Sequence, residues 1–367
     1  MPQFQSARLD LARRRRGLTK TKLAELLGVG TRALSFYLSG DREPGADAID
    51  RMGSVLDFPP AFFLGPEMDE PPLDGVSFRS LSSMTARQRD QAVGSAAIAL
   101  QLDDWIAERF DLPQPDVPRL RRESPESASE AIREAWGLGQ RRAPNMIHLL
   151  EKHGVRVFSL AEDNTAVDAF SFWRGDTPYV FLNTTKTAQH SRMDAAHELG
   201  HLVLHAWGGP SGRGAEEEAK AFGSAFLLPR GSVIAGAPRS ANVQQIIRAK
   251  HHWNVSAMAL AYRMSKLGLL SEWQARTVFS QLGQLGYRKG EPDTERQPRE
   301  TSQVLAKVFG ALRAEGMSRS SIAEQLLVGP RELNTVIFGL VLSSIDGEKA
   351  QADRSPRQGE LRLLKGT

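Results

Sequence analysis

A chain of 367 residues is more than twice the usual size of one domain, which predicts two or three domains. It contains no cysteine, which excludes disulfides and thiolate ligands, so any metal site must be built from histidine and carboxylate side chains. The net charge is +4, and residues 1–32 hold eight lysines and arginines against two acidic residues. The N-terminus lacks the apolar stretch of a signal peptide and no run is long enough to cross a bilayer, which favours a cytoplasmic protein without a membrane partner.

Glycine, proline and polar stretches divide the sequence into units of different predicted structure. Residues 1–66 have a helical pattern, and a linker region with a long helix is expected over 67–127. Residues 128–240 combine helical segments with three β-like runs, "VRVFSL", "AFSFW" and "YVFLN", which predict a small sheet. A C-terminal helical domain over 241–345 and a disordered tail over 346–367 follow. The expected fold class is multidomain α+β, with all-α N-terminal and C-terminal domains around a central domain that holds a small β-sheet.

The stretch "LTKTKLAELLGVGTRALSFYLSG" predicts two helices joined by a tight turn. Leu23 and Leu27 form the buried side of the first helix, and Gly28 permits the turn. A second helix that begins near Thr31 has the width of the DNA major groove, and its first residues would reach base edges. The expected base-reading residues are Thr31, Arg32, Ser35 and Phe36, and the expected phosphate contacts are Lys20 and the run Arg13, Arg14, Arg15 and Arg16.

Through "LAELLGVGTRALSFYLSG" and "FPPAFFL" this segment resembles the XRE (Cro/cI-like repressor) family, which implies binding of double-stranded operator DNA. Lys20 stands where that family often has Gln, and Leu38 where it often has Glu, so no base preference is carried over. The alternative is a helical bundle that makes only protein contacts.

The segment "MDAAHELGHLVLHA", residues 193–206, predicts a helix with metal ligands on one face. His197 and His201 are four residues apart, which places them about 40° apart around the helix axis and one turn along it. Two imidazoles in that position can chelate one ion. Glu198 lies beside them and can act as a general base.

The surroundings of this segment strengthen the prediction. Ser191 and Asp194 are expected to form a capping box at the start of the helix, and Gly200 leaves room for a close neighbour. The run "YVFLN" precedes the helix, where an edge strand of the sheet is expected.

Two residues compete to be the third ligand. His205 lies one further turn along and a further 40° around, so we expect it to be buried and to support the ligands. In the next helix, "EEEAKAFGSAFLLP", the apolar stripe leaves Glu216 nearest to the core, whereas Glu217 points almost the opposite way. Glu216 is therefore the expected ligand, with Glu217 and Glu218 as solvated residues of a first helical turn.

The C-terminal helical domain contains an echo of the N-terminal motif. "RGLTKTKLAELLGVGTRALSFYLSG" aligns without gaps with "EGMSRSSIAEQLLVGPRELNTVIFG", and both predict helix, turn and helix. The second copy begins its last helix with Pro330 and carries Val336, Ile337 and Phe338 on it. We expect this copy to serve packing or dimerisation rather than DNA contact.

The stretches "YVFLNTT", "SRMDAAHELGHLVLH" and "EEEAKAFGSAFLLP" resemble the ImmA/IrrE family of metallo-endopeptidases, in the long form with an XRE domain in front. "HWNVSAMALAYRMSKLGLLS" and "GYRKGEP" are also similar to that form. The resemblance implies a zincin-like central domain in which Zn²⁺ is held by His197, His201 and Glu216, with Glu198 as the general base. It also implies cleavage of a repressor-type transcription factor. Lys220 departs from the family, which usually has Asn or Asp there.

The resulting hypothesis is a zinc metallo-endopeptidase fused to a sequence-specific DNA-binding domain. Its expected partners are operator DNA and a repressor substrate, and a homodimer is compatible with the repressor-like domain. The alternative is a DNA-binding regulator or antitoxin-like repressor whose central domain senses or scaffolds without hydrolysis.

Overall fold

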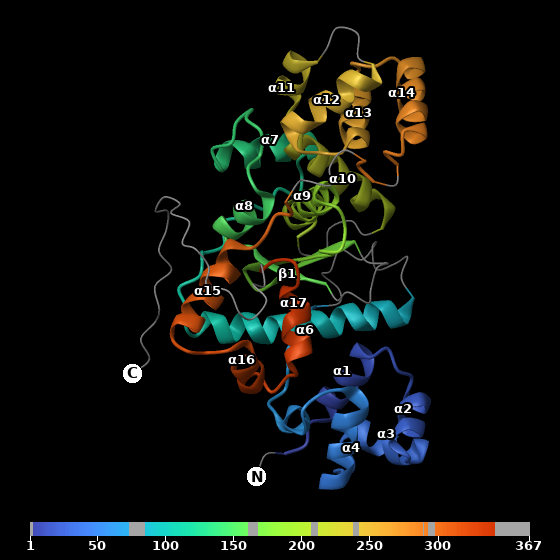
Figure 1. The fold of residues 1–367 in the computed structure, drawn as a ribbon, viewed down its shortest axis with the longest axis vertical. Coiled ribbons are helices and arrows are strands. Elements are labelled where there is room, and N and C mark those ends of the chain that lie inside the picture. Colours follow the sequence, from blue (N-terminus) through green and yellow to red (C-terminus); the bar gives the residue numbers. More distant parts are fainter. Residues whose placement is uncertain are drawn as a thin grey trace.

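The protein is a mostly helical molecule with one small sheet near its centre (Figure 1). The computed structural model describes the following residues: 3–72, 85–160, 168–206, 212–237, 242–288, 290–292 and 298–341. Helices at the N-terminus form one end of the molecule, and the helices between residues 230 and 284 form the other. This arrangement confirms the expected α+β class. The predicted tail over 346–367 lies outside the described residues.

The N-terminal part contains the predicted helix-turn-helix. Thr19 caps its first helix by accepting a hydrogen bond from the backbone N–H of Lys22, and Gly28 ends that helix with a φ of +65°. Leu27 and Leu34 are buried between the two helices, so the opposite side of the second helix faces outward. The elements of this part are α1 (Ser6–Arg15), α2 (Lys20–Leu27), α3 (Thr31–Ser39), α4 (Ala46–Leu56) and the 3-10 helix η1 (Pro60–Leu64).

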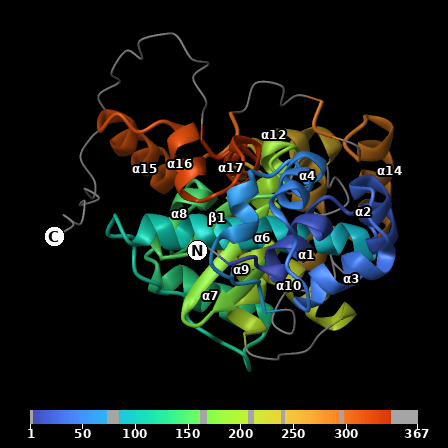
Figure 2. The same ribbon diagram turned by 90° about the horizontal axis from the view of Figure 1, so that it is seen from below.

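A long helix, α6 (Ala86–Ala107), runs between the N-terminal helices and the sheet (Figures 1 and 2). On one side it meets α1 at Gly94, where an added Cβ would lie 3.1 Å from the Cβ of Arg15. On the other side Asp103 accepts a hydrogen bond of 2.7 Å from the hydroxyl of Tyr179 in the sheet. This helix therefore joins the N-terminal helices to the sheet.

The sheet has three strands, β1 (Arg156–Ser159), β2 (Ala169–Arg174) and β3 (Thr177–Leu182), in the order β1-β3-β2. Strand β3 runs parallel to β1 and antiparallel to β2. The prediction that "YVFLN" forms an edge strand is wrong, because β3 pairs on both sides and β2 lies at the edge. A hairpin makes β2 and β3 neighbours, but it does not determine which of them also pairs with β1.

Helices cover the sheet, and α9 lies against β2 and β3 (Figure 1). It also crosses α10 closely: an added Cβ on Gly200 would lie 3.1 Å from the Cα of Ala219, and one on Gly223 would lie 3.0 Å from the backbone nitrogen of His197. Glycine at both positions permits this crossing, as predicted for Gly200. The elements around the sheet are α7 (Pro125–Ala135), α8 (Met146–Lys152), α9 (Ala188–Leu204), α10 (Arg213–Leu227) and α11 (Arg230–Gly236).

Helix α9 begins at Ala188, earlier than predicted. Thr187 is its N-cap and accepts a hydrogen bond from the backbone N–H of His190. The expected capping box of Ser191 and Asp194 therefore does not form, because both residues lie inside the helix. Burial of the Asp194 carboxyl raises its pKa to about 6.

Two groups of helices complete the chain. The first packs against α10, and the second returns to α6, α8 and β1. The first group is α12 (Val243–Trp253), α13 (Ala257–Lys266) and α14 (Glu272–Gln284), and the second is α15 (Gln303–Ala314), α16 (Arg319–Gln325) and α17 (Pro330–Ile337).

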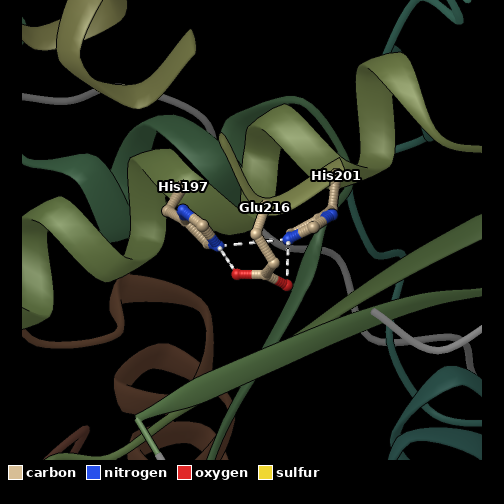
Figure 3. Close-up of side chains that lie close together, drawn as sticks. All are labelled: His197, His201 and Glu216. Carbon is tan, nitrogen blue, oxygen red and sulfur yellow. Dashed lines mark hydrogen bonds and ion pairs between the residues drawn. The ribbon is translucent and has the colours of Figure 1, made fainter. Parts of the chain in front are cut away.

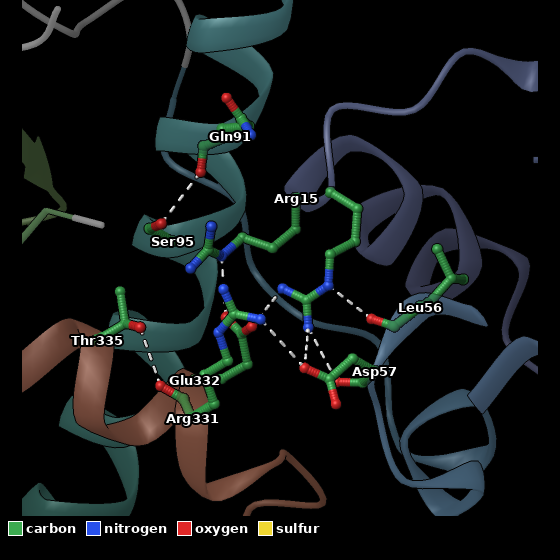
Figure 4. Close-up of polar contacts among 9 residues, drawn as sticks. Arg15, Leu56, Asp57, Gln91, Ser95, Arg331, Glu332 and Thr335 are labelled. Atoms are coloured by element: carbon green, nitrogen blue, oxygen red, sulfur yellow. Dashed lines mark hydrogen bonds and ion pairs between the residues drawn. The ribbon is translucent and has the colours of Figure 1, made fainter. Parts of the chain in front are cut away.

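Helix α17 is the counterpart of α3 in the internal echo, and one side of it packs against α6 (Figures 1 and 4). The carboxylate of Glu332, only 1% exposed, lies 2.9 Å from Nε of Arg15 and 2.5 Å from Nη1 of Arg16. Leu333 and Val336 are buried beside it. The expected packing of this copy is present, while Pro330, Arg331 and Asn334, which match Thr31, Arg32 and Ser35, are exposed.

Candidate metal centre and DNA-reading surface

Two histidines of α9 present their ring nitrogens to the same point. His197 and His201 are one helical turn apart, and their Nε2 atoms lie 3.1 Å from each other. The side chain of His201 is 6% exposed and that of His197 is 21% exposed, so both are largely shielded from solvent.

Glu216, in the first turn of α10, faces both histidines (Figure 3). Its Oε2 lies 3.4 Å from Nε2 of His197, and its Oε1 lies 3.3 Å from Nε2 of His201. Glu217, the next residue, points away and pairs with Arg213 at the surface. The structure therefore brings together the three residues that the sequence analysis selected as ligands, and among the described residues they form the one group of this kind.

The spacing of these donor atoms fits a tetrahedral metal ion. Zinc bonds of about 2.0–2.2 Å to nitrogen and oxygen place the donors at about 3.3–3.5 Å from one another in a tetrahedron. The two histidine nitrogens lie 3.1 Å apart, and each lies 3.3–3.4 Å from a different oxygen of Glu216. With one donor atom taken from each residue, all three donors lie within 4.8 Å of one another. Two imidazoles and one carboxylate form a donor set that suits zinc and leaves the fourth position of a tetrahedron to another ligand.

The charges of the three groups are coupled. Burial disfavours an ionised Glu216, but hydrogen bonds from His197 and His201 outweigh it and lower the pKa of its carboxyl to about 2. Burial acts against a charged His197, yet the hydrogen bond to Glu216 raises the pKa of that imidazole. Glu216 is thus an ionised carboxylate at neutral pH, as a ligand to a cation must be.

Glu198 is buried between α9 and the sheet, with 3% exposure. The hydroxyl of Ser171, on edge strand β2, donates a hydrogen bond of 2.7 Å to its Oε2. Sequence reasoning missed Ser171, whose only signal is a hydroxyl in the otherwise apolar run "AFSFW".

His205 is not part of the cluster of three but contacts one of its members, His201. This position agrees with the expectation that His205 supports the ligands. Its Nδ1 lies 3.0 Å from Nδ1 of His201, and its Nε2 lies 2.9 Å from Oε2 of Glu218. Glu218 is exposed, as expected for a solvated residue near the start of the helix, and its carboxylate also forms a hydrogen bond with His205.

Lys220, which departs from the family pattern, extends toward α13. Its Nζ lies 5.0 Å from the ring centroid of Tyr262, a cation–π distance.

The expected base-reading residues lie on the outward side of α3. The side chains of Thr31, Arg32, Ser35 and Phe36 are all exposed, and Lys20 is exposed at the start of α2. The guanidinium of Arg32 lies 5.7 Å from the ring centroid of Phe36, and the hydroxyl of Ser35 donates to the carbonyl of Thr31.

Arginines of α1 that were expected to contact DNA phosphates form ion pairs within the protein. Arg15 is buried against Glu332, so its predicted phosphate contact is wrong. Arg14 is partly exposed, but its guanidinium pairs with Asp10 and Glu70.

Comparisons with known families agree with this division of the chain. Residues 9–63 match the family model of a helix-turn-helix domain, and residues 150–265 match that of the IrrE N-terminal-like domain, a peptidase family. No curated protein matches the chain. Within the described ranges, none of the helices has the length and apolar character needed to cross a membrane. The chain thus carries, in this order, an XRE-type helix-turn-helix DNA-binding domain and a peptidase-like domain of the ImmA/IrrE family.

Proposed function

We propose that this protein is a zinc-dependent endopeptidase that acts on a repressor while its N-terminal domain is bound to operator DNA. His197, His201 and Glu216 would hold the zinc ion. The observation that carries the proposal is that both histidine nitrogens and the Glu216 carboxylate face one another, with one donor atom from each residue within 4.8 Å of the others, in a region that matches a peptidase family.

Glu198 is the proposed general base. Bound zinc supplies a Lewis acid that polarises a peptide carbonyl and makes water more acidic. Glu198 accepts a proton from the attacking water and then donates it to the leaving amine, so that water and a peptide bond become a carboxylic acid and an amine. The hydroxyl of Ser171 orients the Glu198 carboxylate for both transfers through its hydrogen bond of 2.7 Å.

The DNA-binding domain supplies proximity to the substrate. A protease held on an operator meets a repressor bound nearby at high effective concentration, so weak recognition of the repressor itself is sufficient. This explains why one chain combines a helix-turn-helix with a peptidase-like domain.

A DNA-binding regulator without hydrolysis is the second candidate. Lys220 favours it, because a cation directed toward Tyr262 replaces the polar residue usual in the family. The buried carboxylate of Glu198 favours the peptidase, because a site that only holds a metal has no use for a base.

Glu198→Gln and His201→Ala separate the two candidates. Glutamine keeps the side-chain size but cannot accept the proton, so Glu198→Gln should retain zinc and lower cleavage about 10²–10⁴-fold. His201→Ala should lose zinc and some thermal stability. Cleavage is measured with purified protein and any repressor that is encoded beside its gene, together with repression in cells. If only His201→Ala changes repression and no repressor is cleaved, the protein is a metal-dependent regulator.

The ligand assignment is tested by Glu216→Ala against Glu217→Ala as the matched control. Only Glu216 faces the histidines, so only its variant should lose zinc in metal analysis of the purified proteins. Equal zinc content in both variants would reject Glu216 as a ligand.

A further inference from the structure

A line of hydrogen bonds leads from the metal centre to the protein surface. It begins at His201, passes to His205 over 3.0 Å between their Nδ1 atoms, and ends at Glu218 over 2.9 Å. The side chains of the two histidines are 6% and 8% exposed, whereas that of Glu218 is 49% exposed. The two histidines come from the end of α9, and the glutamate comes from the first turns of α10.

Only one arrangement of protons satisfies every nitrogen along this line when a metal is bound. A metal at Nε2 of His201 requires a lone pair there, so the proton of that ring must be on Nδ1. Nδ1 of His205 then accepts the bond, which places the proton of the second ring on Nε2. That nitrogen faces the carboxylate of Glu218, which can only accept.

We propose that His205 and Glu218 are positioning residues which fix His201 in the orientation and tautomer that bind zinc. The proposal rests on the proposed function, because it concerns the same zinc site. A carboxylate joined directly to a metal-ligating histidine is a common arrangement, and loss of such a partner weakens metal binding about 10–100-fold. Here a second histidine carries the effect from the carboxylate to the ligand.

A purely structural role explains the contacts less well. An ion pair with an exposed partner such as Glu218 adds little to stability, and an apolar residue at position 205 would fill the same space. Neighbouring Glu217 forms an exposed pair of the ordinary kind with Arg213 and has no contact with the histidines. It is therefore the natural control for Glu218.

The test measures the dissociation constant of zinc by competition with a chromophoric chelator. His205→Phe should weaken zinc binding about 10–100-fold, and Glu218→Ala should weaken it by less, because water can replace the exposed carboxylate. The control Glu217→Ala should bind as the unaltered protein does. His205→Gln keeps an acceptor and a donor, so it should recover part of the affinity. The double variant with His205→Phe and Glu218→Ala should bind zinc as tightly as His205→Phe alone, because phenylalanine already removes the hydrogen bonds that connect Glu218 to His201.

Imidazole nitrogen NMR of the zinc-loaded protein gives a second readout that packing alone would not change. It should show His201 protonated at Nδ1 and His205 protonated at Nε2. If the unaltered protein does not bind zinc, the proposed function fails. The positioning role is rejected, and the zinc site stands, if the unaltered protein binds zinc and both Glu218→Ala and His205→Gln bind it as tightly as the unaltered protein does. It is also rejected if the two rings show the opposite tautomers. Glu218→Ala alters an exposed side chain, so the test does not depend on the folding of His205→Phe.

Discussion

The two helix-turn-helix units share their backbone conformation but differ in what the second helix packs against. Gly17, Gly28 and Gly40 have positive φ, and so do their counterparts Gly316, Leu327 and Gly339. Helix α3 exposes Thr31, Arg32, Ser35 and Phe36, and the matching positions of α17 are exposed or half-buried as well. The helices differ at Glu332, which is buried against the arginines of α1, whereas its counterpart Ala33 is half-buried. One sequence pattern therefore determines the local fold in both units, and a few residues on the second helix determine what that helix binds.

Position 332 shows how small that difference is. Its counterpart in the first unit is Ala33, which has no charge, and the change to glutamate gives α17 a buried partner for two arginines. These ion pairs connect α1 of the DNA-binding domain to α17, about 300 residues later in the chain.

The largest expected effect is that of Glu332→Ala. Removal of the carboxylate leaves Arg15 buried without its partner and Arg16 with one partner fewer, and breaking a buried ion pair from one side costs about 3–5 kcal/mol. Arg331→Ala is the control, because its pair with Asp57 is exposed and should contribute about 0–1 kcal/mol. Denaturant unfolding of both variants measures the difference. Equal stability of the two would show that α17 is held by its apolar contacts alone.

Arg32→Ala should lower operator binding by about 1–3 kcal/mol and relax preference at one base pair, because an exposed arginine at the start of α3 can pair with guanine through two hydrogen bonds. Arg331 occupies the same position in the second unit, and Arg331→Ala should leave operator binding unchanged. Titration with operator variants, each altered at one base pair, measures both effects. A comparable loss in both would mean that the second unit also contacts DNA.

The sequence predicted local structure well and partners from distant segments poorly. Helical periodicity selected Glu216 from three adjacent glutamates, because the direction of a side chain follows from its position on one helix. The same reasoning could not find Ser171 beside Glu198, or Glu332 beside Arg15, because those contacts depend on how segments far apart in the chain pack. The order of strands in the sheet was missed for the same reason.

The smallest expected effects concern the phosphate contacts of the first unit, Lys20 and Arg14. When a lysine or arginine that contacts a phosphate is replaced by alanine, the slope of log K against log salt concentration falls by about one unit. Lys20 is exposed and has no ion pair among the described residues, so Lys20→Ala should show nearly this full change.

Arg14 is paired with both Asp10 and Glu70, so it must give up part of those interactions to reach a phosphate. Arg14→Ala should therefore weaken binding to all sequences alike and change the slope by less than Lys20→Ala does. Binding to unrelated DNA over a range of salt concentrations measures both slopes. A larger change for Arg14 would show that its ion pair with Glu70 opens on DNA and that α1 helps to hold the duplex.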